Sequence, residues 1–362
     1  MLVNGLHAKS GGGVTYLANL VPRLAARPDL DLHLLVGADH AARVPAENLT
    51  LHTLDGASGF WRLLWREQAA VPRLARRIGA RVTFSPANFG PFLAPGGVIV
   101  LRNALQVGMV ERRPGKVAYW LLLTLATGLA LATCRRAIAV SDYARRALGG
   151  GLLGFARGKV RVVPHGVADL FSPGDPPPPR GDFVLAVSDI YVQKNFPALV
   201  RAIAPVLRAR PGLELRIAGR ALDPGHMAAL RSLVAARGLA DRVRFLGHVA
   251  PADLVDLYRT CRLFVFPSLV ETFGNPLVEA MACGAPIAAS RAAAMPEVLG
   301  DAAAFFDPRS EADMGAVLEA LLDDDARRAD LSARALARAR DFSWDATAEA
   351  TARVIREAAG AF

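Results

Sequence analysis

Residues 263–286 read LFVFPSLVETFGNPLVEAMACGAP and contain the unit that decides the fold. The continuous apolar run at 263–266 predicts a buried strand, because strands covered on both faces of a sheet are hydrophobic throughout. Asn275 predicts the cap of a following helix, and Gly284 predicts its end. A buried strand that leads into a helix is the repeating unit of a doubly wound α/β sheet.

The same alternation continues on both sides of this unit. Apolar runs are separated by stretches rich in Ala, Leu and Arg, first as LHLLVGA, RVTFSPA, VIVLRN, AIAVS and VRVVPHG. The pattern restarts near Phe183 as FVLAVS, LELRIAG, VRFLGHV, LFVFPS, PIAAS and AAFFD. This order predicts parallel strands joined by helical crossovers. We therefore expect an α/β protein with two Rossmann-like, doubly wound domains.

A proline-rich segment separates the two sets of strands. Residues 172–181, SPGDPPPPRG, do not suit a helix and are typical of an extended linker. We expect an N-terminal domain at residues 1–174 and a C-terminal domain at residues 175–342. Residues 343–362 have apolar positions at helical spacing after Ser343, which predicts a capped helix packing back towards the N-terminal domain. The first strand is short, and we expect a few further residues before it.

The composition limits the class of protein and its partners. The 362 residues are 52% hydrophobic and 21% charged, which predicts a globular protein with more than one core. Three widely spaced cysteines give no disulfide or zinc pattern, and no secretory signal is visible, so a cytoplasmic location is expected. The net charge of +10 favours an anionic lipid or a phosphorylated substrate. We expect no nucleic acid, because no nucleic-acid-binding motif accompanies the charge.

Two glutamates flank the turn between the strand and the helix of residues 263–286. Glu271 is in the loop beyond the carboxyl end of the strand, where open α/β sheets bind ligands, and Glu279 is predicted in the first helical turn. Backbone N–H groups at 274–277 predict an adjacent anion site. Together these groups suit a diphosphate joined to sugars. The residues equally permit a structural interpretation, in which Glu279 complements the helix dipole and Glu271 is solvated.

The longer run from Pro267 resembles a known family. PSLVETFGNPLVEAMACGAPIAAS, followed by MPEVLGDAAAFFDP, is similar to the E-x7-E signature of retaining glycosyltransferase family 4. GGGVTYLANLVPRLA, CRRAIAVSDYAR, VRVVPHGV, VSDIYVQKN and FLGHV extend the resemblance over nearly the whole chain. It implies the GT-B fold, with two Rossmann-like domains facing a cleft, and a nucleotide-sugar donor used without metal or other cofactor. It also implies retaining transfer of a hexose from a UDP-, GDP- or dTDP-linked sugar to a lipid-linked or polysaccharide acceptor in cell-envelope glycan synthesis.

The resemblance also assigns candidate site residues. Glu279 would hold the ribose hydroxyls and Glu271 the donor sugar. Lys194, in YVQKN, would neutralise the leaving diphosphate, and Lys194 and Glu271 are the predicted catalytic residues. The further predicted donor-binding residues are Gly11, Gly12, Gly13, Asn103, Thr272, Phe273, Gly274, Asn275, Pro276 and Leu277.

Two positions depart from the family pattern. Asp189 stands where many members have Arg, which weakens the expected phosphate clamp, and Arg102 and Asn103 stand where many members have His. Two other functions therefore stay open. A non-catalytic scaffold that binds sugar nucleotides or polysaccharide would be excluded by donor turnover. A GT-B phosphorylase or epimerase is the second alternative, and a phosphorylase would depend absolutely on phosphate.

Three further features need an interpretation. His165 is either a packed hinge residue or a ligand contact, and Asp323–Asp325 is expected to be a solvated helix cap and not a metal site. Residues 117–134, VAYWLLLTLATGLALATC, carry no charge and reach the length of a membrane span. A span would divide one predicted sheet, so the segment is either a core helix or an interfacial helix. Its cationic flanks favour peripheral attachment to the anionic inner face of the cell membrane.

Overall fold

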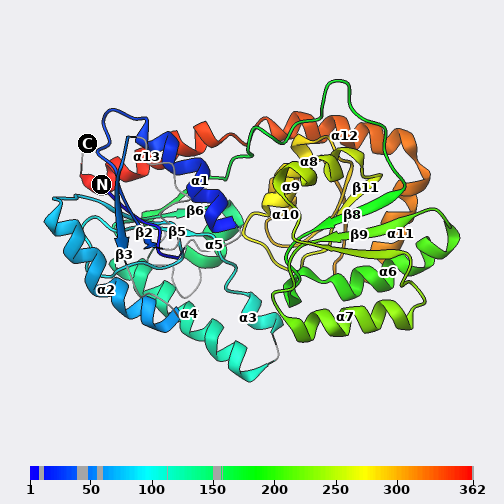
Figure 1. Ribbon diagram of the computed structural model, residues 1–362, viewed down its shortest axis with the longest axis horizontal. Coiled ribbons are helices and arrows are strands. Elements are labelled where there is room, and N and C mark those ends of the chain that lie inside the picture. Colours follow the sequence, from blue (N-terminus) through cyan, green and yellow to red (C-terminus); the bar gives the residue numbers. More distant parts are fainter. Residues whose placement is uncertain are drawn as a thin grey trace. The chain divides into compact units, whose positions relative to one another are not determined.

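The chain divides into two compact units. The computed structural model describes residues 1–7, 12–38, 48–54, 60–111, 113–149, 156 and 158–360. Unit 1 comprises Met1–Gly108, Arg113–Gly166 and Ser343–Phe362, and unit 2 comprises Met109–Arg112 and Val167–Phe342. Each unit contains one parallel sheet with helices on both faces (Figure 1). The predicted α/β class with two Rossmann-like domains is confirmed.

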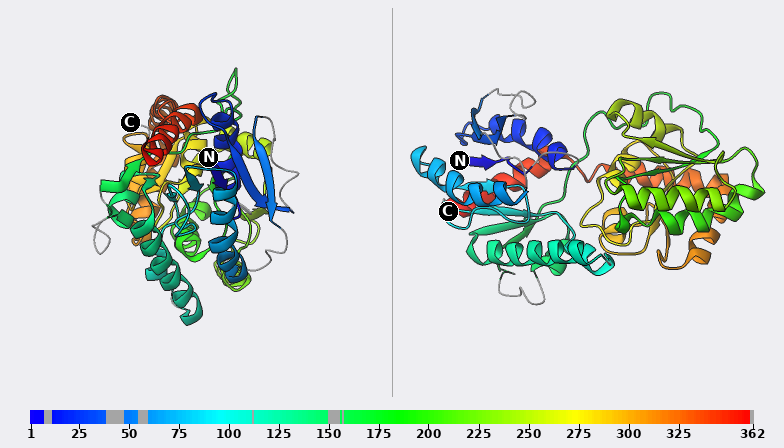
Figure 2. Two further views of the ribbon diagram at one scale, coloured as in Figure 1. Left: turned by 90° about the vertical axis from the view of Figure 1, so that its left-hand side faces the viewer. Right: turned by 60° about the horizontal axis from the view of Figure 1, so that its bottom comes forward.

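Unit 1 contains a parallel sheet with the strand order β3-β2-β1-β4-β5-β6-β7. The strands are β1 (Leu2–Asn4), β2 (His33–Gly37), β3 (Thr50–Leu54), β4 (Thr83–Ser85), β5 (Val98–Leu101), β6 (Arg136–Ala139) and β7 (Val160–Val162). The helices are α1 (Gly12–Ala25), α2 (Phe60–Arg77), α3 (Val107–Val110), α4 (Pro114–Thr133), α5 (Asp142–Gly149) and α13 (Trp344–Ala359). Helices α1 and α13 cover one face of the sheet, and α2 and α4 lie on the other side (Figures 1 and 2).

Unit 2 contains a second parallel sheet with the order β10-β9-β8-β11-β12-β13. Its strands are β8 (Phe183–Val187), β9 (Glu214–Ala218), β10 (Val243–Gly247), β11 (Leu263–Phe266), β12 (Ile287–Ser290) and β13 (Ala304–Phe306). The helices are η3 (Val192–Lys194), α6 (Phe196–Ala209), α7 (Pro224–Ala236), α8 (Pro251–Thr260), α9 (Asn275–Ala282), α10 (Met295–Leu299), α11 (Glu311–Asp323) and α12 (Asp325–Ala339). In Figure 1, α6 and α7 cover one face and α8, α9 and α12 the other.

The strand order reverses once in each sheet, between β1 and β4 in unit 1 and between β8 and β11 in unit 2. At such a reversal the two crossover helices lie on opposite faces, so the loops at the carboxyl ends of the two strands diverge and leave room for a ligand. The loop after β8 carries Lys194, and the loop after β11 carries Glu271. The fold therefore brings these two predicted residues to one place on the edge of the unit 2 sheet.

The proline-rich segment 172–181 belongs to unit 2, so the observed division differs from the predicted boundary at 174/175. The guanidinium of Arg259 donates to the carbonyl and the hydroxyl oxygen of Ser172, at 2.6 and 2.8 Å. The guanidinium of Arg180 donates to the carbonyl of Cys261 at 3.0 Å. These bonds attach the segment to the unit, and the chain passes between the units at Gly166 and Val167 instead.

One secondary-structure prediction is confirmed, and one strand has no counterpart among the predictions. Ser343 caps α13, because its hydroxyl accepts from the N–H groups of Asp345 and Ala346, so that prediction is confirmed. Strand β3 was not predicted. It is an edge strand with only partial burial, and its sequence TLHTL lacks the continuous apolar run of the buried strands.

Helix α4 includes most of the predicted apolar segment. It buries Leu123, Thr127, Ala130 and Leu131 in unit 1. Several of its leucines are exposed, and Leu125 keeps 62% of its surface. The alternative of a fully buried core helix is therefore wrong. Among the described residues, α4 is the one helix long and apolar enough to cross a membrane.

Candidate functional site

Lys194 and Glu271 form an ion pair at the carboxyl edge of the unit 2 sheet. The ammonium of Lys194 donates to Oε1 of Glu271, and each side chain is 16% exposed. The ammonium also lies 5.7 Å from the ring centroid of Phe266, the last residue of β11. The N–H of Leu269 donates to the carbonyl of Gln193 at 2.8 Å, which fastens the two loops together. The pair is thus half-buried and held by both strands at the reversal point.

The loop that carries Glu271 is also fixed from the next strand. The hydroxyl of Ser290, at the end of β12, donates to the carbonyl of Ser268 at 2.7 Å. The N–H of Ala294 donates to the carbonyl of Glu271 at 3.3 Å. The carboxylate is therefore placed by three consecutive strands of the sheet order, which favours a defined geometry for ligand binding.

Glu279 is in α9, with its side chain half-buried. The prediction that it lies in the first helical turn is wrong, because the helix begins at Asn275 and Glu279 is one turn further on. This position also removes the interpretation that Glu279 complements the helix dipole, which acts mainly in the first turn. The hydroxyl of buried Tyr258 donates to Oε2 of Glu279 at 3.0 Å. Burial raises the pKa of Glu279 to about 7, although the Tyr258 bond acts in the opposite direction.

The helix start differs from the predicted anion site. The cap is Gly274 and not Asn275 as predicted, and the φ of 93° at Gly274 suits glycine. Pro276 has no N–H, and the N–H of Leu277 donates to the carbonyl of Gly274 at 2.9 Å. The prediction of free N–H groups throughout 274–277 is therefore wrong.

The side chains around this helix start are largely internal. Thr272, Phe273 and Leu277 are buried, and the Phe273 ring packs 5.6 Å from that of Phe342. Side chains buried in this way shape the loop and do not offer polar groups to a ligand. Glu271 and Asn275 are the predicted residues of this segment whose polar side chains keep partial exposure.

A second ion pair lies beside the first and was not predicted from the sequence. Asp189, after β8, accepts bonds from the backbone N–H, Nε and Nη2 of Arg220, after β9, at 2.9, 3.2 and 2.7 Å. Partial burial opposes ionisation of Asp189, but the bonds from Arg220 and the charges of Arg220 and Lys194 together lower its pKa. The sequence motif contains Asp189 but not Arg220, because the strand pairing that brings the two together is not visible in a motif.

The remaining predicted residues are in unit 1. Gly11 lies outside the described residues, and Gly12 and Gly13 are the first two residues of α1. Asn103 is exposed after β5. Its backbone N–H donates to Oδ1 of fully buried Asn88 at 2.8 Å, and Nδ2 of Asn88 donates to its carbonyl at 3.0 Å. Asn88 thus fixes the predicted residue, and the sequence analysis missed it.

A buried polar cluster occupies the reversal point of the unit 1 sheet and was also missed. Asn4 ends β1, and its amide donates to Oε1 of Glu67 and, at 3.2 Å, to the hydroxyl of Ser85 at the end of β4. Oε2 of Glu67 lies 2.6 Å from Nε2 of His7. These groups are scattered over 80 residues of sequence, so no short motif contains them. Their position makes them candidates for contact with a hydroxyl-bearing ligand.

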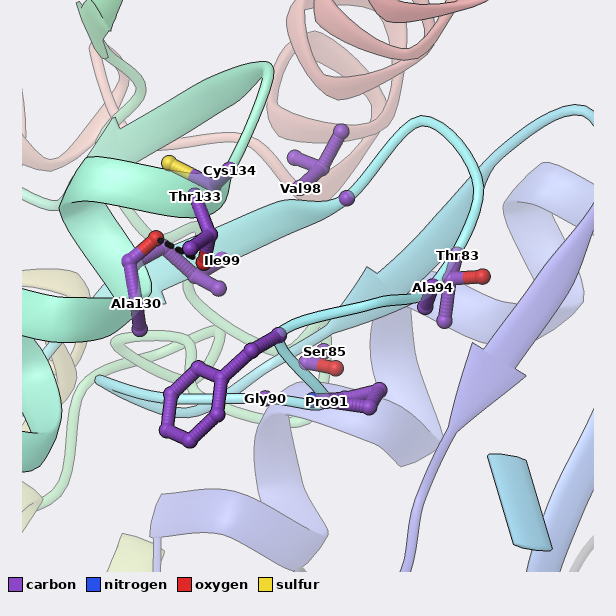
Figure 3. A pocket seen from close by; sticks show the side chains of 12 residues that line it. Thr83, Ser85, Gly90, Pro91, Ala94, Val98, Ile99, Ala130, Thr133 and Cys134 are labelled. Atoms are coloured by element: carbon purple, nitrogen blue, oxygen red, sulfur yellow. Dashed lines mark hydrogen bonds between the residues drawn. The ribbon is translucent and has the colours of Figure 1, made fainter. Parts of the chain in front are cut away.

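Two hollows lined by described residues lie elsewhere. One, in unit 1, lies between the loop at 90–94 and α4 and is lined by Ser85, Gly90 and Ala130 (Figure 3). Its volume of about 10 Å³ holds at most one water molecule. The other, about 590 Å³, is in unit 2 between Arg180 and Arg262, before β8 and β11, at the sheet edge opposite to Lys194.

Two predictions outside these sites have outcomes. His165 is buried, and its ring stacks 5.8 Å from that of Trp344 and lies 5.0 Å from that of Tyr16, as expected of a packing residue. Asp324 caps α12 by accepting from the N–H of Arg327, so the cap interpretation of the aspartate run is confirmed. No cluster of His, Cys, Asp or Glu suited to a metal ion occurs in the part of the chain that the structure describes.

Two doubly wound parallel sheets in one chain, with charged groups at the reversal point of the second, define the GT-B class of fold. The fold is similar to that of sucrose-phosphate synthase from Thermosynechococcus elongatus, with a TM-score of 0.80, 19% identity, and 100% and 99% of the two chains covered. It is also similar to Anabaena Alr3699/HepE in complex with UDP and glucose, with a TM-score of 0.77, 20% identity, and 97% and 98% covered.

Sequence comparison matches the second unit to a family model. Residues 172–338, which are most of unit 2, match the model of the family described as "Glycosyl transferases group 1". The serotype-specific mannosyltransferase WbdA of Escherichia coli is 36% identical over 168 residues, which are 46% of this chain and 21% of that protein. The D-inositol 3-phosphate glycosyltransferase of Kineococcus radiotolerans is 37% identical over 253 residues, 62% of this chain and 57% of that protein. The chain thus spans less than two thirds of these curated relatives.

Proposed function

We propose that the protein is a retaining glycosyltransferase that moves a hexose from a nucleotide diphosphate sugar to a hydroxyl of an acceptor. The observation that carries this proposal is the Lys194–Glu271 pair at the reversal point of a group 1 glycosyltransferase domain. A ligand at this place meets an ammonium and a carboxylate held at fixed positions. The ammonium suits a phosphate and the carboxylate suits the hydroxyls of a sugar.

The proposed reaction depends mainly on electrostatic stabilisation. The bond between the anomeric carbon and the diphosphate breaks while the acceptor oxygen bonds to the same face of the sugar, and a phosphate oxygen takes the acceptor proton. Lys194 has three N–H donors, so it can keep Glu271 and bind a departing phosphate oxygen together. One such charge-assisted bond contributes about 1.5–3 kcal/mol. We propose that these protein groups stabilise the leaving diphosphate without a metal ion.

Glu279 and Tyr258 are proposed to receive the nucleoside part of the donor. The carboxylate would accept from the ribose hydroxyls, as the family resemblance implies. Oε2 of Glu279 already accepts from Tyr258, which leaves Oε1 and further lone pairs of the carboxylate for the ribose. This division gives Glu279 a binding role and leaves bond breaking to the groups around the diphosphate.

The donor and acceptor are proposed by class. Anabaena HepE was solved with UDP-glucose, and relatives include an O-antigen chain mannosyltransferase B of Escherichia coli. The HepE complex supports a UDP-linked hexose as donor, and GDP- and dTDP-linked sugars are further candidates. The two proteins also support a lipid-linked or polysaccharide acceptor in cell-envelope glycan synthesis.

We also propose peripheral attachment to the inner face of the cell membrane through unit 1. The exposed leucines of α4 offer an apolar face, and Arg113 and Lys116 stand at its start. On the same side of the sheet, α2 carries exposed arginines and Trp65, which is 76% exposed (Figures 1 and 2). Apolar side chains beside cationic ones are typical of helices that lie in an anionic lipid interface.

Donor turnover tests the proposed function. UDP-, GDP- and dTDP-hexoses are incubated with the protein and lipid extracts, and the products are followed by mass spectrometry. We expect Lys194→Ala and Glu279→Ala to lower donor turnover at least tenfold, while Glu319→Ala, at an exposed position of α11, keeps the wild-type rate. Wild-type rates in both site variants would refute the site assignment. Turnover with an absolute need for phosphate would indicate a phosphorylase, and no turnover of any donor would indicate a binding scaffold.

A further inference from the structure

Backbone hydrogen bonds join the loop after β8 to the loop after β9. The register pairs Val187 with Ala218, and the pairing continues as a bridge between Ile190 and Ala221. The N–H of Ser188 donates to the carbonyl of Ala218 at 2.9 Å, and the N–H of Ile190 donates to that of Arg220 at 2.7 Å. Asp189 and Arg220 therefore face each other in a rigid double loop at the same sheet edge as Lys194.

Gly219 makes this close approach possible. Its φ is +153°, and a Cβ at this position would lie 1.9 Å from the carbonyl oxygen of Ser188. A side chain at position 219 would therefore push the two loops apart. The glycine lets the backbone of Arg220 come close enough for its N–H to reach Asp189, in addition to the guanidinium.

Only one edge of the Arg220 guanidinium, formed by Nε and Nη2, is bonded to Asp189. Nε and Nη2 donate to the two oxygens of Asp189, whereas Nη1 makes no hydrogen bond within the described residues. The side chain is 37% exposed, so the N–H groups of Nη1 are open to a ligand. A guanidinium fixed on one edge keeps its remaining donors in a defined plane, which suits phosphate oxygens.

The charge of Lys194 alone does not balance the diphosphate of the proposed donor. A nucleotide diphosphate sugar has two negative phosphates, and Lys194 shares its charge with Glu271. Position 189 contributes a carboxylate, and that carboxylate holds the guanidinium of Arg220 in place. The charge of Lys194 contributes to the ionisation of Asp189, which indicates that the two ion pairs are neighbours.

We propose that Arg220 is the second diphosphate-binding residue of the donor site and that Asp189 is the residue that positions it. The cation expected at position 189 is then supplied from the adjacent strand. The sequence alone suggested that Asp189 weakens phosphate binding. In this proposal Asp189 instead orients the guanidinium of Arg220, which binds the diphosphate together with Lys194. This inference rests on the proposed use of a nucleotide diphosphate donor.

Binding of nucleotides to the full chain tests the proposal. UDP, GDP and the corresponding nucleosides uridine and guanosine are titrated by calorimetry against the wild type and the variants. We expect Arg220→Ala to weaken binding of the preferred diphosphate about 10- to 100-fold, because one charge-assisted contact is lost, and to leave the nucleoside unchanged. Asp189→Asn should give a smaller loss, because Arg220 stays charged but is less well oriented.

A relocated cation separates a binding role from a structural one. The double variant Asp189→Arg/Arg220→Ala places the guanidinium in the loop after β8. It should recover at least a third of the change in log Kd that Arg220→Ala causes. Arg244→Ala is the matched control, since Arg244 forms a similar ion pair with Glu214 and is exposed on β10. It should bind UDP like the wild type. If Arg220→Ala fails to fold by circular dichroism, Arg220→Gln replaces it and keeps part of the hydrogen bonding.

The outcomes distinguish this inference from the proposed function. A wild type that binds no nucleoside diphosphate would overturn both. A wild type that binds one, with Arg220→Ala equally tight or with nucleoside and diphosphate weakened alike, would overturn the role of Arg220 and leave the proposed function standing. Failure of the relocated guanidinium to restore any affinity would contradict the transfer of the cationic role between the strands.

Discussion

Replacing Glu279 by Gln should make unit 2 more stable, and increasingly so as the pH rises. In the folded chain, burial raises the pKa of Glu279 from 4.5 to about 7, so the native state holds the proton more tightly than the unfolded state. The free energy of unfolding therefore falls as the pH rises through this interval. The whole displacement corresponds to about 3 kcal/mol, of which about 2.5 kcal/mol is lost between pH 5 and pH 8.

Glutamine is neutral at every pH and keeps the size of the side chain. The difference in unfolding free energy between Glu279→Gln and the wild type should thus grow by about 2.5 kcal/mol from pH 5 to pH 8. Tyr258→Phe removes the hydrogen bond that favours the carboxylate, so its stability should fall more steeply with pH than that of the wild type.

The assay has to measure the unfolding of unit 2, which contains Glu279. The four tryptophans, Trp61, Trp65, Trp120 and Trp344, all belong to unit 1, so tryptophan fluorescence would follow the other unit. Hydrogen exchange of peptides from β11 and α9, followed by mass spectrometry over a urea series, measures the relevant opening free energy. Parallel pH profiles for Glu279→Gln and the wild type would refute the assignment of a buried, proton-binding carboxylate.

Three further predictions concern the ligands and unit 1. Affinity for UDP-glucose should rise up to about tenfold from pH 6 to pH 8, because ribose hydroxyls donate better to ionised Glu279, and calorimetry with Glu279→Gln should give a flat profile. Asn88→Ala should lower the stability of unit 1 by about 2–4 kcal/mol in urea titrations followed by tryptophan fluorescence, because two backbone N–H groups lose their acceptor; an unchanged midpoint would contradict this. The wild type should pellet with anionic vesicles at low salt, Leu125→Glu should pellet less, and exposed Leu222→Glu should behave as the wild type; equal recovery from neutral vesicles would contradict the attachment.

The fold was predictable from the sequence because its signals are local. Buried parallel strands are continuous apolar runs, and the runs from Phe183 onwards mark the strands of unit 2. The sequence does not predict edge strand β3, because its residues are only partly buried and form no continuous apolar run. The domain boundary was misplaced because prolines indicate extended backbone but not the unit to which it is attached, which here depends on Arg259 and Arg180.

The candidate site was predictable only in part. Lys194 and Glu271 stand in recognisable motifs, and the strand order brings them into contact. Partners such as Arg220, Tyr258 and Asn88 are distant in sequence and meet these residues only through pairing and packing. At the start of α9, the missing N–H of Pro276 can be read from the sequence, whereas the bond from the N–H of Leu277 to the carbonyl of Gly274 depends on a backbone conformation that a sequence pattern does not define.

The double loop after β8 and β9 has an evolutionary consequence. Gly219 has no room for a side chain, and Arg220 is held by Asp189. We therefore expect positions 189, 219 and 220 to covary in evolution. In an alignment of related chains, a carboxylate at position 189 should occur together with Gly at 219 and Arg at 220, whereas chains with a basic residue at 189 should vary freely at 220. Such covariation would show which strand supplies the charge in each related chain.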